Sequence, residues 1–275
     1  MFLPSIIWES DRIINSIGYT RWFDKASSLF SHVDSYQDKL LTTYHVIDIA
    51  RHMKTLAILS RKGGAGKTTI AVHLAVAAEA YGIATAVFDL DPQASAALWT
   101  DHRGEPIPAV IPAQAPRLQS LLAQARKNDA DLVILDTAPN ADTIAAEAAN
   151  SADVVVIPCR PRGFDLDAIG ATVRLAQTAG KPAYIVINAA PVQGVETAEA
   201  TAALSAAGLA VCPVVLHHRK AYASRIHEGR TAQETEPNGK AAAEVNALLL
   251  WLNEKVILLS KSQVSKVTNK QEKVR

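Results

Sequence analysis

The chain has 275 residues, 28 basic against 27 acidic side chains, a formal net charge of +1 at pH 7 and 49% hydrophobic residues. This hydrophobic content excludes a wholly disordered chain, and the balanced charge means that any affinity for polyanions needs a local basic patch. With only two cysteines, Cys159 and Cys212, a disulfide scaffold and a cysteine-built zinc site are excluded, and we expect two buried thiols.

Alanine is distributed unevenly along the chain. Residues 53–250 contain 46 alanines in 198 positions, whereas residues 1–52 and 251–275 together contain two in 77. We therefore expect one working domain with flanks of a different character. The predicted parts are an N-terminal extension, either disordered or a misassigned start, over 1–52, the domain over 53–256, and a basic tail over 257–275.

No apolar run approaches the ~20 residues that a membrane-spanning helix needs. The first basic residue, Arg12, follows Glu9 and Asp11, which is the wrong order for a secretory signal. We expect a cytoplasmic protein.

From residue 54 onward, short apolar runs alternate with amphipathic stretches. Strands are predicted at 55–60, 85–89, 131–136, 153–158, 183–188 and 211–216. Helices are predicted at 67–81, 116–127, 165–179, 196–207, 219–228 and 240–256. This alternation predicts an α/β fold with a doubly wound, mostly parallel sheet, helices on both faces, and functional residues at the carboxyl ends of the strands.

The strongest motif is a glycine-rich loop between the first predicted strand and helix. Its glycines let the backbone turn N–H groups inward around an anion, and the helix start adds free donors and the positive end of its dipole. We expect phosphates to be bound by Gly63, Gly64, Ala65, Gly66, Lys67, Thr68 and Thr69. Lys67 is placed for the β- and γ-phosphates, and the Thr68 hydroxyl for Mg²⁺.

The standard pattern G-x-x-x-x-G-K-[ST] requires its first glycine at position 61, where this chain has arginine. Three glycines before a lysine also fit a tight strand-to-helix turn that binds nothing. The order of strand, loop and helix favours phosphate binding.

Carboxylates follow two further predicted strands. Pro92 ends the strand at 85–89, which leaves Asp91 on the loop above the phosphates, where it can hold the attacking water or a water bound to Mg²⁺. The alternative is that Asp89 and Asp91 form a solvated acid pair at a strand end. Asp136 follows four apolar residues, the Walker B form, and such an aspartate orients Mg²⁺ through its water shell. The predicted metal site is Thr68, Asp89 and Asp136, with the aspartates acting through water.

Lys62-Gly-Gly-Ala-Gly-Lys-Thr-Thr69 resembles the deviant Walker A motif of the ParA/MinD ATPases. Asp89-Leu-Asp-Pro-Gln93 and Asp136-Thr-Ala-Pro139 are similar to the switch I and switch II segments of ParA-type partition ATPases, and the stretch 219–230 and Glu234 also look like that family. The resemblance covers roughly residues 53–256 and is closest to the short plasmid-partition type.

This resemblance implies a P-loop NTPase-like form of the predicted α/β fold. It also implies ATP and Mg²⁺ as cofactors and a slow intrinsic Mg-dependent ATP hydrolysis. It implies that Lys62 reaches across an ATP-sandwiched homodimer to the partner's nucleotide, that Asp91 positions the water and that Asp136 is the Walker B carboxylate. Asn188 and Pro213 are implied to flank the adenine, although an asparagine at a strand end is also a common turn residue.

The resemblance further implies DNA segregation: an ATP dimer that binds DNA without sequence preference, associates with the nucleoid and is stimulated by a centromere-binding adaptor. A basic patch for DNA is predicted from Arg219, Lys220, Arg225 and Arg230, which align only approximately on one face of the predicted helix. A solvated helix surface is the alternative.

Two other functions stay open. A MinD-like positioning ATPase recruited to membranes is compatible with the apolar stretch 245–259 and its basic flank, although 245–252 also fits a helix that closes the domain. A metabolic or reductase relative with the same loop is less compatible, because an iron–sulfur reductase needs paired cysteines at a dimer interface.

Overall fold

The computed structural model of the chain describes residues 53–163, 166–256, 264 and 267–269. The chain divides into two units at the boundary between His52 and Met53, and the described residues belong to the second unit. The predicted extension over 1–52 lies outside the described residues, as does most of the predicted tail over 257–275.

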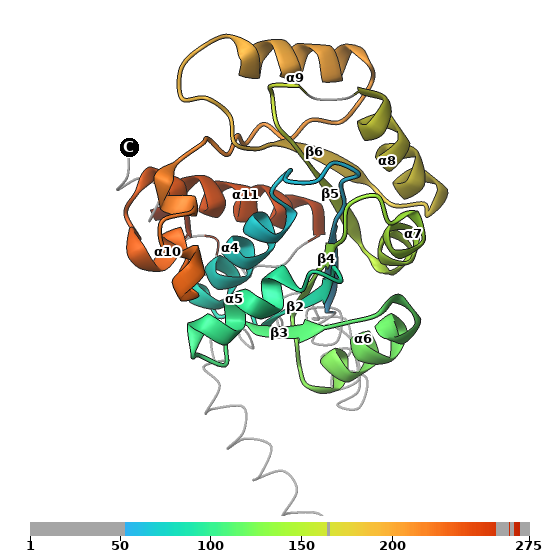
Figure 1. The fold of residues 1–275 in the computed structure, drawn as a ribbon, viewed down its shortest axis with the longest axis vertical. Helices are drawn as coiled ribbons and strands as arrows, with labels where there is room; N and C mark the ends of the chain where they lie inside the picture. The colour runs from blue at the N-terminus through green and yellow to red at the C-terminus, as the bar shows by residue number, and fades with distance from the viewer. Residues whose placement is uncertain (1–52, 164–165, 257–263, 265–266, 270–275) are drawn as a thin grey trace, which may run out of the picture. The chain divides into compact units, whose positions relative to one another are not determined.

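The core is one six-stranded sheet in the order β3-β2-β4-β1-β5-β6, in which every pair of neighbours is parallel (Figure 1). The strands are β1 Lys54–Ile58, β2 Thr85–Leu90, β3 Ala109–Pro112, β4 Leu132–Thr137, β5 Val154–Cys159 and β6 Ala183–Ile187. The central strands are nearly continuous aliphatic runs because both of their faces are covered.

Helices cover both faces of this sheet (Figure 1). They are α4 Lys67–Ala80, α5 Ser95–Arg103, α6 Leu118–Lys127, α7 Asp142–Ser151, α8 Leu166–Thr178, α9 Glu196–Ala206, α10 Ala232–Thr235 and α11 Lys240–Val256. α4 and α11 share a hydrophobic core with one face, and α6, α7, α8 and α9 share a second core with the other. The predicted doubly wound α/β fold is confirmed.

Strand β1 shows how one sequence fills both cores. Leu56 and Ile58 lie in the core with α4 and α11, whereas Ala57 and Leu59 lie in the core with α7 and α8. Side chains alternate across a strand, so a run without polar interruptions buries both of its faces.

The sixth predicted strand, at 211–216, is wrong. Among the described residues, 211–217 run beside β6 and the residues that follow it and make only two isolated bridges, Ile185 with Val211 and Ala190 with His217. Pro213 has no backbone N–H to donate in a regular ladder. The sheet nevertheless has six strands, because β3, which was not predicted, forms its opposite edge.

The helix predicted at 219–228 is also wrong. Residues 220–222 and 226–228 form two separate 3₁₀ turns, and Gly229 follows in the left-handed region with φ of +70°. Helices α5, α7 and α10 were not predicted. The helix predicted at 240–256 is confirmed as α11, and its residues Val245, Leu248, Leu249 and Leu252 are buried.

Both cysteines are free and buried, as predicted. Burial raises the pKa of each thiol to about 11. Among the described residues, no helix is both long enough and apolar enough to cross a membrane.

Candidate functional site

The glycine-rich loop leads from β1 into α4 at the carboxyl edge of the sheet. Gly64 and Gly66 adopt φ values of +69° and +97°, which side chains with a Cβ rarely adopt. Helix α4 then begins at Lys67 without a side-chain cap. Within the described part of the chain, no hydrogen bond occupies the backbone N–H groups of residues 63–69. The loop therefore presents a set of free donors at a helix N-terminus, which suits an anion.

Lys67, the first residue of α4, is held in the loop. Its side chain is 7% exposed, and its Nζ lies 3.4 Å from the Ser60 carbonyl oxygen. Burial lowers the pKa of Lys67, while the nearby Asp136 and Asp91 act in the opposite direction. A desolvated ammonium beside carboxylates suits a site that receives further negative charge.

Asp136 lies near the end of β4, level with Asp89 on β2 and with Ile58 on β1. Its side chain is fully buried, and neither carboxylate oxygen has a hydrogen-bond partner of normal geometry among the described residues. Burial raises the pKa of Asp136 to about 7, the Thr68 hydroxyl and Lys67 lower it, and Asp89 raises it. A buried carboxylate with two free oxygens beside a threonine hydroxyl fits a divalent cation, because hard cations prefer oxygen ligands.

Asp89 and Asp91 hold the segment that follows β2. Asp89 Oδ2 accepts the N–H groups of Ala96 and Ala97 at 2.9 and 3.0 Å, and its Oδ1 accepts the N–H of Asp91 at 3.1 Å. Asp91 Oδ1 accepts the N–H of Gln93 at 2.9 Å. Asp89 thus anchors the start of α5, and its predicted part in the metal site stays a prediction. Asp91 lies close enough to raise the pKa of Lys67.

Lys62 is exposed, and its Nζ donates a hydrogen bond to the Gly163 carbonyl oxygen in the loop after β5. Its ammonium is therefore at the same sheet edge as the phosphate loop but is not folded into that loop. Its predicted role across a dimer stays a prediction.

Asn188 follows β6 and contacts the phosphate loop directly. Its Nδ2 donates to the Ala65 carbonyl oxygen at 2.7 Å, and a Cβ at Gly66 would lie 2.1 Å from Nδ2. Pro213 is exposed on the segment beside β6, and no hydrogen bond among the described residues joins it to the loop. The adenine contacts predicted for Asn188 and Pro213 stay predictions.

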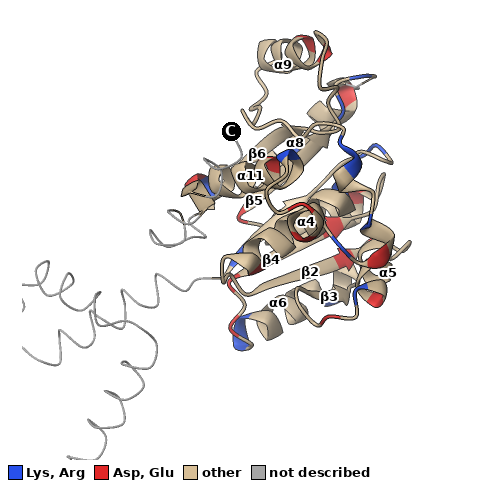
Figure 2. Cartoon of the chain, turned by 90° about the vertical axis from the view of Figure 1, so that its left-hand side faces the viewer, with Lys and Arg blue, Asp and Glu red and all other residues tan. Residues whose placement is uncertain are grey.

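The four basic residues predicted to bind DNA do not share one helix face, because the helix is absent. Three of them are paired with carboxylates: Arg219 with Glu244, Arg225 with Glu228, and Arg230 with Glu105 and Glu234. Lys220 is exposed. In the view of Figure 2, basic and acidic residues are interspersed along the described loops. The predicted alignment on a helix is wrong, and the DNA contacts themselves stay predictions.

Sequence reasoning missed a group of residues that connect distant parts of the site. His73, Arg103 and Glu244 join segments far apart in the chain. A histidine inside an alanine-rich helix and an arginine at a helix end have no local signature that reveals such partners. Only the spacing of Glu234, four residues after Arg230, could have pointed to one of these contacts from the sequence.

A protein-family comparison matches residues 56–232 to the "CobQ/CobB/MinD/ParA nucleotide binding domain". The chain is 31% identical over 202 residues to a "Maintenance of carboxysome distribution protein A" of Gloeobacter kilaueensis, covering 70% of this chain and 93% of the relative. It is 34% identical over 116 residues to "Protein ParA" of Rhizobium radiobacter, covering 41% of this chain and 51% of the relative.

Among solved structures, the Cyanothece McdA(D38A)–ATP complex superimposes with a TM-score of 0.60 at 20% identity, covering 76% of this chain and 98% of that chain. This likeness agrees with the observed sheet and its surrounding helices. The loop geometry, the strand-end carboxylates and the family match over most of the domain agree, and the chain belongs to the CobQ/CobB/MinD/ParA nucleotide-binding family.

Proposed function

We propose that this chain is a Mg-dependent ATPase that segregates a plasmid or chromosome through an ATP-dependent homodimer, which binds DNA without sequence preference and is stimulated by a centromere-binding adaptor. The observation that carries its ATPase part is the buried Asp136 carboxylate, with both oxygens free, beside the unoccupied donors of the phosphate loop. Family membership and the resemblance of its motifs to partition ATPases support the rest.

Each residue of the site has a distinct task in this proposal. The N–H groups of residues 63–69 bind the phosphate oxygens, and Lys67 neutralises charge on the β- and γ-phosphates. Thr68 and Asp136 would hold Mg²⁺, the second through water, and the ion would offset charge that develops on the phosphate oxygens. Asp91 orients the attacking water, and Asp89 keeps the Asp91 loop in register by anchoring α5.

Substitution of Lys62 tests its proposed role across the ATP-dependent dimer. We expect Lys62→Ala to abolish ATP-dependent dimerisation, because an exposed ammonium that its own loop does not bury is available to a second nucleotide. Sedimentation velocity with ATP measures this, and Lys127→Ala, at the end of α6, is the matched control. A dimer of undiminished amount in the Lys62 variant would refute the role across the interface.

Substitution of Asp91 tests its proposed role in orienting the water that hydrolyses ATP. We expect Asp91→Ala to bind ATP and to accumulate as the dimer, since removal of the carboxylate that orients water slows the chemical step by about 10²-fold or more. Phosphate release and sedimentation are measured on the same sample. Normal phosphate release by this variant would contradict the assignment.

The two candidate functions differ in the surface that the ATP form binds, which is DNA in one and a membrane in the other. We favour DNA over a membrane because, within the described part of α11, Val245, Leu248, Leu249 and Leu252 are packed in the core and are not available to lipid. Co-sedimentation with plasmid DNA and with liposomes, each with ATP, separates the two. ATP-dependent binding to liposomes alone would exclude the partition function.

A second cargo class is supported by the relative from Gloeobacter kilaueensis, whose printed name concerns carboxysome distribution and 93% of which is covered. In that case the adaptor would sit on a protein body rather than on a DNA site, while the ATPase works in the same way. Affinity capture with the Asp91→Ala dimer, followed by identification of the retained adaptor and of any DNA bound to it, distinguishes the two cargoes. In either case we expect the ATP form to associate with the nucleoid.

A further inference from the structure

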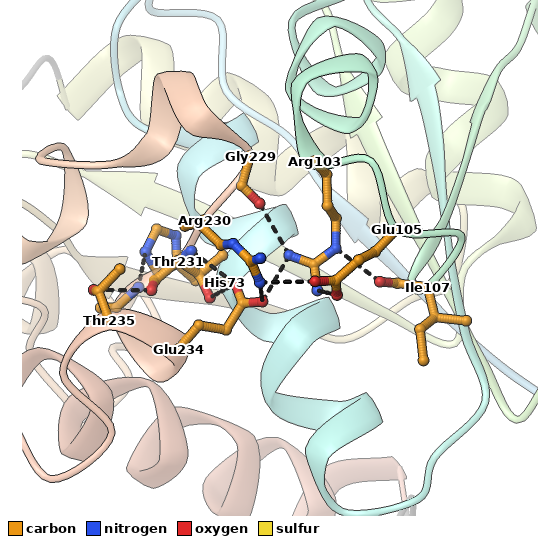
Figure 3. A network of polar contacts seen from close by, with 10 residues as sticks. His73, Arg103, Glu105, Ile107, Gly229, Arg230, Thr231, Glu234 and Thr235 are labelled. Carbon is orange, nitrogen blue, oxygen red and sulfur yellow. Dashed lines mark hydrogen bonds and ion pairs between the residues drawn. The ribbon is translucent and has the colours of Figure 1, made fainter.

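Residues 226–235, which follow the basic residues Arg219, Lys220 and Arg225, are held between the two helices that leave the nucleotide site. One is α4, which continues the phosphate loop, and the other is α5, which continues the Asp89–Asp91 segment. Figure 3 shows the polar contacts that converge on this segment.

Helix α5 is fixed at both ends. Its start is held by Asp89, as described above. At its end, the Arg103 side chain is 5% exposed and stacks over Trp99, with Cζ 5.1 Å from the ring centroid. Whatever moves the start of this nine-residue helix therefore also moves Arg103, because a short helix behaves as a rigid rod.

Arg103 joins α5 to the segment beyond it. Its Nη1 lies 2.8 Å from Glu234 Oε1 and 2.9 Å from the Gly229 carbonyl oxygen. Its Nη2 lies 3.1 Å from Glu105 Oε2, and its Nε donates to the Ile107 carbonyl oxygen at 2.8 Å. All three nitrogens of the guanidinium are thus engaged, and two of these contacts lead to residues more than 120 positions away.

Gly229 permits the close approach. A Cβ at this position would lie 2.2 Å from Arg103 Cα, so the backbone of the segment touches the backbone of the α5 end. No side chain separates the two, and a displacement of α5 cannot be absorbed by a rotamer change between them.

Glu234 completes the link on the other side. It accepts hydrogen bonds from the N–H and the hydroxyl of Thr231 at 2.8 and 2.9 Å. The bond from the Thr231 N–H, together with the Thr231 side chain accepting the Glu234 N–H, makes a capping box at the start of α10. Burial raises the pKa of Glu234, but the bonds from Thr231 and the charge of Arg103 outweigh it and lower the pKa overall. This carboxylate is therefore ionised and oriented, as a strong partner of a buried guanidinium must be.

Helix α4 supplies the fixed side of the arrangement. His73 is 1% exposed; its Nδ1 lies 2.8 Å from the Thr69 carbonyl oxygen, and its Nε2 accepts the N–H of Ala232 at 3.2 Å. The segment is therefore attached to α4 at the start of α10 and to α5 at Gly229.

We propose that Arg103 and Glu234 are positioning residues that make the affinity of the 219–230 surface for DNA depend on the nucleotide. A change at Asp89–Asp91 when ATP binds is carried by α5 to Gly229 and shifts the exposed Lys220 and Arg225 relative to α4. This inference rests on the proposed function, because it explains how one ligand alters the affinity for the other.

The test is the ratio of the DNA dissociation constants measured without and with ATP, on the full chain and with mixed-sequence duplex DNA. We expect Glu234→Gln and Arg103→Lys each to lower this ratio by about fivefold or more, towards one, with ATP affinity within about twofold of wild type. A circular-dichroism melt shows that each variant is folded. The matched control is Glu228→Gln, which makes the same chemical change on the same segment but removes only exposed contacts, those with Arg225 and His227; its ratio should equal that of the wild type.

The outcomes separate the two proposals. A wild-type ratio of one contradicts the proposed function, and the link falls with it. A wild-type ratio above one that Glu234→Gln leaves unchanged overturns the link alone. A parallel loss of ATP affinity in both link variants also overturns it, because the pair would then serve the nucleotide site itself.

Discussion

Asp136 is a carboxylate in a fully buried position, where its ionised form is unfavourable unless a cation is bound. This burial raises the pKa of the Asp136 carboxylate to about 7 even though the Thr68 hydroxyl and Lys67 lower it. Above that pH the folded chain carries an ionised group that the unfolded chain would hydrate, so the residue lowers stability when no cation is bound. Binding of Mg²⁺ and ATP is expected to reverse this effect.

We expect Asp136→Asn to raise the free energy of unfolding by about 2 kcal/mol at about pH 8 without nucleotide, because the uncompensated buried charge is removed. With Mg²⁺ and ATP the order should reverse, since only the wild type gains stability from the ligand. Urea unfolding, with and without Mg-ATP, measures both effects. Asp142→Asn is the control, because that carboxylate is exposed; equal stability changes in the two variants would contradict this account.

At this scale the sequence predicted the residues whose chemistry is local. Gly66 and Lys67 lie within one motif, and Asp136 lies near the end of an apolar strand, so local pattern was enough to make them candidates. The contact of Asn188 with Ala65 and the pair of Arg103 with Glu234 join residues more than 120 positions apart. No periodicity records such partners, because they meet only after the sheet has formed.

Among the secondary-structure elements, long and strongly patterned segments were predicted well. The six strands include five predicted ones, and α4, α8 and α11 agree closely with expectation. The missed strand β3 has only four residues at a sheet edge, and α5 is polar and short. Residues 219–228 have helical composition, but contacts with α5 and with Glu244 divide them into turns, so tertiary packing outweighs local propensity.

The tight junction between α5 and Gly229 can be tested by a single methyl group. We expect Gly229→Ala to lower the free energy of unfolding by about 3 kcal/mol, because strain at φ +70° adds to the overlap with Arg103. Gly208→Ala is the matched control: its φ is +73°, but nothing lies within 4 Å of the added Cβ, so only the strain, about 1 kcal/mol, applies. Equal losses in the two variants, measured by chemical denaturation, would show that the junction is not tight.

The attachment of α4 to α10 through His73 predicts a dependence on pH. Burial lowers the pKa of His73 from 6.5 to about 4, so between these values the unfolded chain binds a proton that the folded chain does not. Stability should therefore fall as the pH falls through this window, by about 2 kcal/mol between about pH 7 and about pH 5.

The His73→Gln variant isolates this contribution, since it has no proton to gain there. We expect its unfolding free energy to lack that part of the decline, whereas His218→Gln, at an exposed position, should follow the wild type. Identical pH profiles for wild type and His73→Gln would contradict the burial of a neutral imidazole.

For the whole molecule, every described contact of the candidate site comes from residues 58–244, and the two sheet faces are covered by helices after residue 66. We expect residues 53–275 alone to bind ATP with an affinity within about twofold of the full chain and to melt at a similar temperature. Isothermal titration and a thermal melt check this. A clear loss of affinity on deletion would assign residues 1–52 a direct part in the nucleotide site.

Because Cys159 and Cys212 are buried, a cysteine introduced on the surface can be labelled selectively. A thiol with a pKa near 11 is almost wholly protonated at neutral pH, and maleimide reagents react with the thiolate. A cysteine placed at the exposed position of Lys220 would therefore be labelled in preference to Cys159 and Cys212, without removing either from the core. A single fluorophore there would report the motion of the 219–230 surface in real time as ATP is added.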